Sequence, residues 1–368
     1  AGVSVTTGIE NVLIGNQAGD ALTDADHNVS IGYASLSTDT LGSQSTAIGH
    51  FALNTQNMTT ATDTNNTAVG FFAGRQVTTG TSLTFIGASS GGSNGAAVDN
   101  TGVGKESLTS NTNGHYNTAV GSQALKILNH STSTLARNTA VGYNAGTALT
   151  TGIYNTIVGS EAGDAMTDAD GNTAIGTLAL TTNTLGHGST AVGNSALQTQ
   201  NYATATSAYN TAVGHSAGFS ITTGTFNTCV GGLAGDNMTT GSSNTIVGYN
   251  SGGNTITGSN NSIMGRDAGN DLTSGSNNIF IGHDAGLTGS PGGSITTASN
   301  TIVLGDENIS ACHIQTDWTV ASDQRDKADF TALDLGLDFV KALAPVTYKW
   351  DKRSKYVDKN DVDLDTIV

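Results

Sequence analysis

A five-residue pattern, Asn-Thr-Ala-Val-Gly or a close variant, recurs along residues 11–305. Within the pattern, Thr alternates with small or branched apolar residues, which is the two-residue period of a short β-strand. The Gly and the Ala-Gly or Ala-Leu that follow permit tight corners, and a polar turn such as Thr150–Gly152 comes next. We therefore expect one short strand per repeat, joined to the next by compact turns.

The spacing of the repeat predicts the architecture. The glycines that close the pattern lie 17 residues apart, with 21 at three places, so that a 72-residue super-period links Gly70, Gly142 and Gly214. Seventeen residues suit one coil of a narrow solenoid and are too few for a repeat of two helices. We expect an all-β fold, a narrow β-solenoid or β-roll of 17- and 21-residue coils over residues 1–305. At about 4.8 Å per stacked strand, 17 coils would make a rod of about 80 Å.

The same residue types recur at each level, so side chains should stack along the rod. We expect a thin apolar column made of Val120, Val141, Ile157 or Val158, and Ile175. A ladder of side-chain amides should run beside it, made of Asn117, Asn138, Asn155 and Asn172. One such rod buries little apolar area because Ala and Gly dominate. We therefore expect a homotrimer in which the rods pack along their Ala and Gly faces, with a monomeric capped solenoid as the alternative.

Composition removes several classes of protein. Gly is 49 of 368 residues and Pro only 2, without a Gly-X-Y period, which excludes collagen. The regular Val, Ile and Ala spacing argues against a disordered linker, and no apolar run approaches the roughly 18 residues of a membrane span. The two Cys residues are too few for a disulfide framework.

Charge divides the chain near residue 321. Residues 1–321 hold 5 Lys and Arg against 19 Asp and Glu, a net of −14, whereas residues 322–368 hold 8 against 10, a net of −2. The acidic body repels phosphate backbones, so we expect no nucleic-acid partner, and we expect no membrane insertion. We predict a shaft over 1–305, a transition segment over 306–321 and a second domain that starts at 322.

The repeat resembles the left-handed β-roll heads of trimeric autotransporter adhesins and the repeat regions of phage tail fibres. The resemblance covers most of residues 9–305. It implies a trimeric, extracellular appendage.

The C-terminal segment carries a different pattern. Leu333, Leu337, Val340 and Leu343 fall at helical spacing, Pro345 ends that helix, and Val346–Trp350 alternates as a strand, which predicts a small α+β segment. With the Ser-Asp-x-Arg-x-Lys run at 322–327 and the later Pro-Val-x-Tyr-x-Trp, it resembles the start of the intramolecular chaperone domain of phage tail fibres and endosialidase tailspikes.

That resemblance implies a specific chemistry. In the family the chaperone drives trimer assembly and then cuts itself off before the Ser, which here would be the Ala321–Ser322 bond. Ser322 would be the nucleophile and Lys327 its base, and the Lys would have to be neutral, as burial can achieve by lowering its pKa. The alternative is that Ser322 and Asp323 cap a helix and Lys327 is solvated. A self-cleaving peptidase therefore remains an open interpretation.

Other candidate sites are weaker. Asp24-x-Asp26-x-Asn28 and Asp168-x-Asp170-x-Asn172 have the spacing of calcium ligands, but a closing Glu is lacking and Asx turns explain them equally well. His313, beside Cys312, would recur three times in a trimer and is the one His we consider for a metal. No carboxylate pair of a glycosidase and no Thr-x-Thr row of an ice-binding face is recognisable. We expect no cofactor and no metal.

The three 21-residue coils each add four residues, and these insertions carry Met58, Ile127, His130 and Tyr202. Loops on a rigid scaffold often hold binding residues, so we predict that these four contact a host receptor or glycan. The alternative is that the insertions are neutral spacers.

Together with these patterns, the two resemblances imply a structural phage tail fibre or similar virion appendage for host attachment, located on the virion tail. Its partners would be two further copies of itself, other tail proteins and a host cell-surface receptor or glycan. The alternative is a trimeric bacterial surface adhesin with the same chaperone.

The intact mass of the denatured full-length product tests the self-cleavage. A mass that ends at Ala321, with the full-length mass restored by Ser322→Ala, would establish self-cleavage, because the substitution removes the nucleophile. An uncut wild-type chain would make Ser322 a structural cap and the chaperone a permanent tip.

Overall fold

The computed structural model describes residues 1–315. The chain divides into two compact units, Ala1–Ala311 and Cys312–Val368. The predicted helix over 333–343, the predicted strand Val346–Trp350, and the residues Ser322 and Lys327 lie outside the described residues. Within the described range, no helix is long and apolar enough to cross a bilayer.

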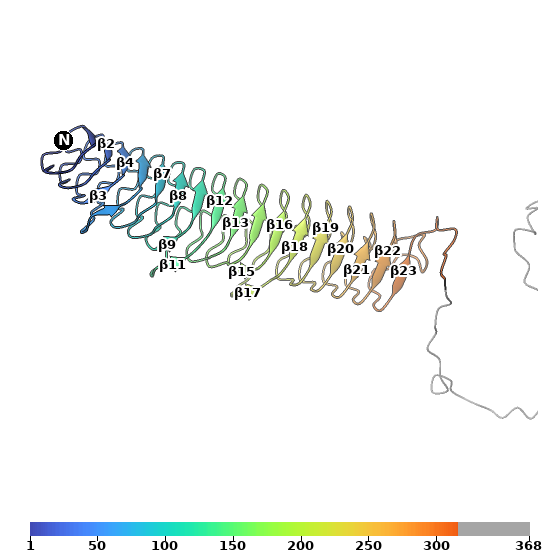
Figure 1. Cartoon of the computed structure of the whole chain (residues 1–368). Coiled ribbons are helices and arrows are strands. Elements are labelled where there is room, and N and C mark those ends of the chain that lie inside the picture. Colours follow the sequence, from blue (N-terminus) through green and yellow to red (C-terminus); the bar gives the residue numbers. More distant parts are fainter. Residues whose placement is uncertain (316–368) are drawn as a thin grey trace, which may run out of the picture. The chain divides into compact units, whose positions relative to one another are not determined.

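The first unit is a parallel β-solenoid, as the repeat predicts (Figure 1). One three-residue strand per coil joins a 17-stranded parallel sheet in which each strand pairs with that of the next coil, Thr118 opposite Thr139 for example. The strands, in spatial order, are β1 (Val12–Ile14), β2 (Val29–Ile31), β4 (Thr46–Ile48), β6 (Thr67–Val69), β7 (Thr84–Ile86), β8 (Thr101–Val103), β10 (Thr118–Val120), β12 (Thr139–Val141), β13 (Thr156–Val158), β14 (Thr173–Ile175), β16 (Thr190–Val192), β18 (Thr211–Val213), β19 (Thr228–Val230), β20 (Thr245–Val247), β21 (Ser262–Met264), β22 (Ile279–Ile281) and β23 (Ile302–Leu304).

The middle residue of each strand faces the interior. Ala119, Ala140 and Ile157 are fully buried, and Cys229 takes the same place in β19. The first and third residues of a strand must then face outward, because successive side chains alternate.

Two predictions are therefore wrong. Of the expected apolar column only Ile157 is interior: Val120 and Val158 are half-buried, while Val141 and Ile175 are 37% and 38% exposed. The Ala face lies inside each rod's own core, so it is not available for packing between rods.

The amide ladder is confirmed and explains that orientation. The backbone N–H of Asn155 donates to Asn138 Oδ1 at 2.9 Å, and Asn155 Nδ2 donates to the carbonyl of Ala169 at 2.7 Å. The N–H of Asn172 repeats the first bond one coil later, to Asn155 Oδ1. Because the Asn before each strand points inward, the middle residue of the strand, two positions later, points inward as well. The first and third residues of the strand, usually Thr and Val, therefore point outward.

A second ladder, of glycines, closes each strand. Gly142 and Gly159 both have φ of +141°, and a methyl group on Gly142 would lie 2.3 Å from the carbonyl oxygen of Gly159. Only glycine combines this conformation with so close an approach of two backbones.

The extra residues of the 21-residue coils form short strands that pair with the preceding coil, rather than loose loops. Three two-residue pairs result: β3 (Gly42–Ser43) with β5 (Thr62–Asp63), β9 (Gly114–His115) with β11 (Thr134–Leu135), and β15 (Gly186–His187) with β17 (Thr206–Ser207). Each pair follows a turn in which an Asx oxygen accepts the glycine N–H, as Asn183 Oδ1 does from Gly186 at 3.0 Å.

Replacing a ladder glycine should destabilise the rod far more than replacing an unconstrained one. We predict that Gly142→Ala costs roughly 3 kcal/mol or more, because backbone strain and overpacking each cost about 1–3 kcal/mol. Gly293→Ala is the matched control: its φ is +73°, but nothing lies within 4 Å of the added methyl. It should cost only about 1–2 kcal/mol. Thermal melting followed by circular dichroism would measure both, and equal losses would contradict the ladder's role.

Candidate interaction surfaces

Three of the four side chains predicted to contact a receptor are buried. Met58, His130 and Tyr202 are 4%, 5% and 6% exposed, and they occupy equivalent places 72 residues apart. Each side chain is buried within a 21-residue coil. Ile127 is 40% exposed, so a receptor contact by the side chain stays a prediction for this residue.

The two polar members of that set are held differently. The Tyr202 hydroxyl donates to the Gly224 carbonyl at 2.7 Å and accepts from Asn210 Nδ2 at 3.2 Å, and burial raises its pKa to about 12. His130 Nε2 is buried with no hydrogen-bond partner in the described part of the chain. Burial lowers the pKa of His130, partly opposed by the charges of Asp168 and Asp170.

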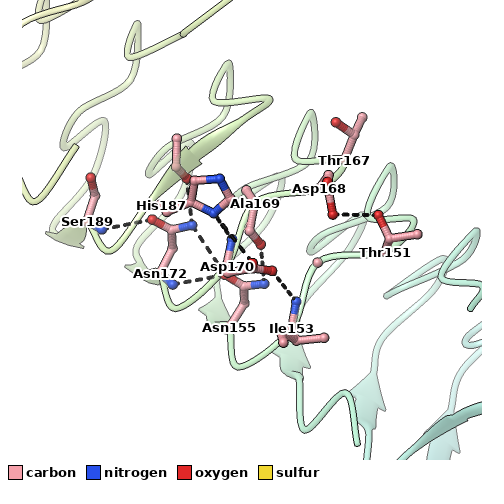
Figure 2. A network of polar contacts seen from close by, with 12 residues as sticks. Thr151, Ile153, Asn155, Thr167, Asp168, Ala169, Asp170, Asn172, His187 and Ser189 are labelled. Carbon is pink, nitrogen blue, oxygen red and sulfur yellow. Dashed lines mark hydrogen bonds and ion pairs between the residues drawn. The ribbon is translucent and has the colours of Figure 1, made fainter. Parts of the chain in front are cut away.

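The carboxylates with calcium-like spacing join consecutive coils (Figure 2). Asp168 Oδ1 accepts from the Thr151 hydroxyl at 2.6 Å, and Asp170 Oδ1 accepts from the Ile153 N–H at 2.8 Å. His187 Nδ1 in turn accepts from the Asp170 N–H at 2.9 Å. Asp24 and Asp26 accept from Thr7 and Ile9 in the same way. These bonds give the repeated acids a structural role between coils.

One titratable cluster was not predicted. Ligand atoms of Asp267, His283 and Asp284 lie within 4.8 Å of one another. The guanidinium of Arg266 already occupies the group, with Nη2 at 2.6 Å from His283 Nε2 and Nε at 3.0 Å from Asp267. The other ring nitrogen of His283 faces Asp306 at 3.1 Å, which lowers the pKa of that carboxyl. Cys312 and His313 are exposed.

The outer face of the 17-stranded sheet is a continuous apolar and hydroxyl surface, here called the strip. It consists of the first and third residues of every strand of that sheet: Val, Thr, Ser or Ile in the first position and Ile, Val, Met or Leu in the third. No Asp, Glu, Lys or Arg occurs among them over the whole length of the sheet. The strip therefore lacks charge although residues 1–321 carry a net charge of −14.

Two columns of larger side chains border the strip. The leading column holds the residues two positions before each strand, and the trailing column those two positions after it. Rings stack along each: in the leading column the Arg137 guanidinium lies 5.9 Å from the rings of both Tyr116 and Tyr154. In the trailing column the centroid of the His50 ring is 5.2 Å from that of Tyr33 and 5.3 Å from that of Phe71.

Comparison with known proteins informs the second unit. A family model described as chaperone of endosialidase matches residues 322–364. Comparisons with curated proteins and with solved structures give no match. The chain thus joins a parallel β-solenoid to a segment similar to that chaperone family.

The buried His130 makes stability depend on pH. Its lowered pKa means that the folded state disfavours the proton, so stability should fall as pH drops through about 6.5, where the unfolded His takes it up. We predict that His130→Met, which copies the equivalent Met58, removes this loss.

The test compares melting temperatures of wild type and His130→Met between pH 7.5 and 5. The advantage of the variant should grow as pH falls. Tyr202→Met is the control at the next equivalent position and should shift the melting temperature by the same amount across this range. A pH-independent difference in melting temperature between wild type and His130→Met would contradict the lowered pKa of His130 in the folded state.

Proposed function

We propose that this chain is the rod of a homotrimeric virion appendage, a phage tail fibre that attaches the virion to its host. The C-terminal segment would act as an intramolecular chaperone for trimer assembly. The function is mechanical reach and attachment, exerted outside the cell, without turnover of a substrate.

The strip is the observation that carries this proposal. Large exposed apolar surfaces on soluble proteins usually mark an interface, and this one runs along every coil. Burying it would contribute roughly 25 cal/mol per Å² of apolar area, and a single rod lacks this contribution. Its uniform composition suits a partner with the same period, and the partner available with that period is another copy of the chain.

Closed rotational symmetry fits the position of the strip. When rods surround a common axis, the strip of each chain is buried in the same environment and no copy of it is left exposed. The match of residues 322–364 to a chaperone of endosialidase supports three chains rather than another number, because the resemblance of this segment implies trimer assembly. The packing face is then the strip rather than the Ala face expected from the sequence.

Receptor contact would fall to the surfaces that such an assembly leaves outside. The small sheets of the 21-residue coils present the exposed Thr60, Thr132 and Thr204 at equivalent places 72 residues apart. Four coils separate neighbouring sites, about 19 Å along the rod. Equal sites at equal intervals suit a repetitive ligand such as a host surface glycan. Other tail proteins would bind one end of the rod and attach it to the virion.

The proposed self-cleavage depends on the C-terminal segment. Self-cleavage before Ser322, with Lys327 as base, is proposed on the resemblance of that segment. A trimeric surface adhesin would use the same rod, and it is the alternative for the setting in which the rod works.

A charge on the strip should separate the chains without unfolding them. We predict that Val158→Glu keeps the circular dichroism of the rod but lowers the solution mass from three chains to one. Three carboxylates at one level near the axis would have to be desolvated together. Val158→Ile should leave the trimer intact.

Ala203→Glu is the matched control for added charge, because Ala203 is exposed on an insertion away from the strip. Sedimentation velocity of the full chain measures the mass. A wild-type chain that sediments as a monomer would overturn the proposal, as would a Val158→Glu variant that remains trimeric.

A further inference from the structure

We infer that the two borders of the strip are complementary surfaces: the leading column of one protomer packs, coil by coil, against the trailing column of the next. This inference rests on the proposed function, since it specifies the contact that a ring of chains would make. The partner is a second copy of this chain in parallel orientation and in the same register.

Geometry brings the two columns together only between chains. Within one chain they lie on opposite sides of a three-residue strand, which alone spans about 10 Å. In the described residues, no hydrogen bond or ion pair joins a leading residue to the trailing residue of the same coil. When the strips of several parallel rods face one axis, the leading border of each rod comes next to the trailing border of its neighbour. Rotation about that axis keeps equal coils at equal heights.

The sizes of the side chains are complementary at four levels. Where the leading residue is a large ring, the trailing residue tends to be small, and the reverse also occurs. The levels that show this are Tyr116 with Ser122, Tyr154 with Ser160, Phe226 with Gly232, and Ser243 with Tyr249. The four rings are about half exposed in the single chain. Each of these rings would face a small residue of the neighbouring chain rather than a second ring.

The charges are complementary as well. At the level of β8, leading Asp99 is opposite trailing Lys105, and at the level of β12, leading Arg137 is opposite the ring of Tyr143. No level between β1 and β23 places like charges in the two columns. Asp99 is exposed and has no ion-pair partner in the described part of the chain. Lys105 of a neighbouring chain would supply one.

Two levels combine ring with ring, His27 with Tyr33 and Tyr209 with His215. Such pairs can stack in offset or edge-on arrangements. An antiparallel pair of rods would instead place each residue against an unrelated level, and the correspondence of size and charge would be lost. The pattern thus favours parallel chains in register.

Cysteine cross-linking tests the contact directly. In full-length chain with Cys312→Ser, the pair Tyr116→Cys and Ser122→Cys should form disulfides between chains on mild oxidation. A disulfide requires Cα atoms about 4.4–6.8 Å apart, which the two positions of one chain cannot meet. Covalent trimers should appear on a non-reducing denaturing gel. Tyr154→Cys with Ser160→Cys should behave alike.

Two controls separate register from general proximity. Tyr116→Cys with Ser160→Cys joins levels two coils apart, about 10 Å, and should not cross-link. Tyr116→Cys alone should not cross-link either, because leading columns do not meet. A wild-type trimer with no cross-link in the first pair, or with cross-links in either control, would overturn the inference and leave the proposed trimer standing. A monomeric wild-type chain would overturn both.

A charge exchange gives an independent measurement. Asp99→Lys and Lys105→Asp should each weaken trimer association at least ~10-fold, because each places like charges at three interfaces. The double variant should recover to within about 3-fold of wild type. Lys105 also lies 3.5 Å from Glu106, but that contact is lost equally in Lys105→Asp and in the double variant. If the losses of trimer affinity in the two single variants simply add in the double variant, the pairing of Asp99 with Lys105 between chains is contradicted.

Discussion

The inward-pointing amide before each strand is the constraint on which the rest of the rod depends. Asn138, Asn155 and Asn172 pair with one another's backbone N–H groups and reach a carbonyl fourteen residues onward. Buried amides must be satisfied, so the ladder can form only with the Asn inside. Strand alternation then assigns the small residue to the core and leaves Thr and Val outside. The core composition and the exposed strip therefore follow from one hydrogen-bonded column.

A narrow interior explains the remaining composition. Ala stands at the middle of seven of the 17 strands, and backbones approach so closely at Gly142 and Gly159 that any side chain would collide. Met58, His130 and Tyr202 are buried in the three coils that carry the insertions. The strip stays outside this core in a single rod, which leaves association of the chains as a source of further stability.

The sequence predicted the parts of the fold that repeat. The spacing of the glycines predicted the coil length and the solenoid, and the repeated Asn residues predicted the amide ladder. The prediction of buried Val120 and Val141 failed because an Asn facing inward and a Val three residues later cannot share one face of a strand. Tyr202 was placed in an exposed loop because the preceding Asn183–Gly186 turn, which begins the small sheet, was not recognised as a strand signal. The cluster around His283 could not be predicted, since its members meet only when separate coils are stacked.

The mass per unit length of the full-length assembly, measured by small-angle scattering of a monodisperse sample, tests the central claim most directly. The account predicts a rod section of about 80 Å, the length of one stack of 17 coils, that contains the repeats of three chains side by side. One chain per 80 Å, or chains joined end to end into a longer and thinner rod, would contradict assembly through the strip.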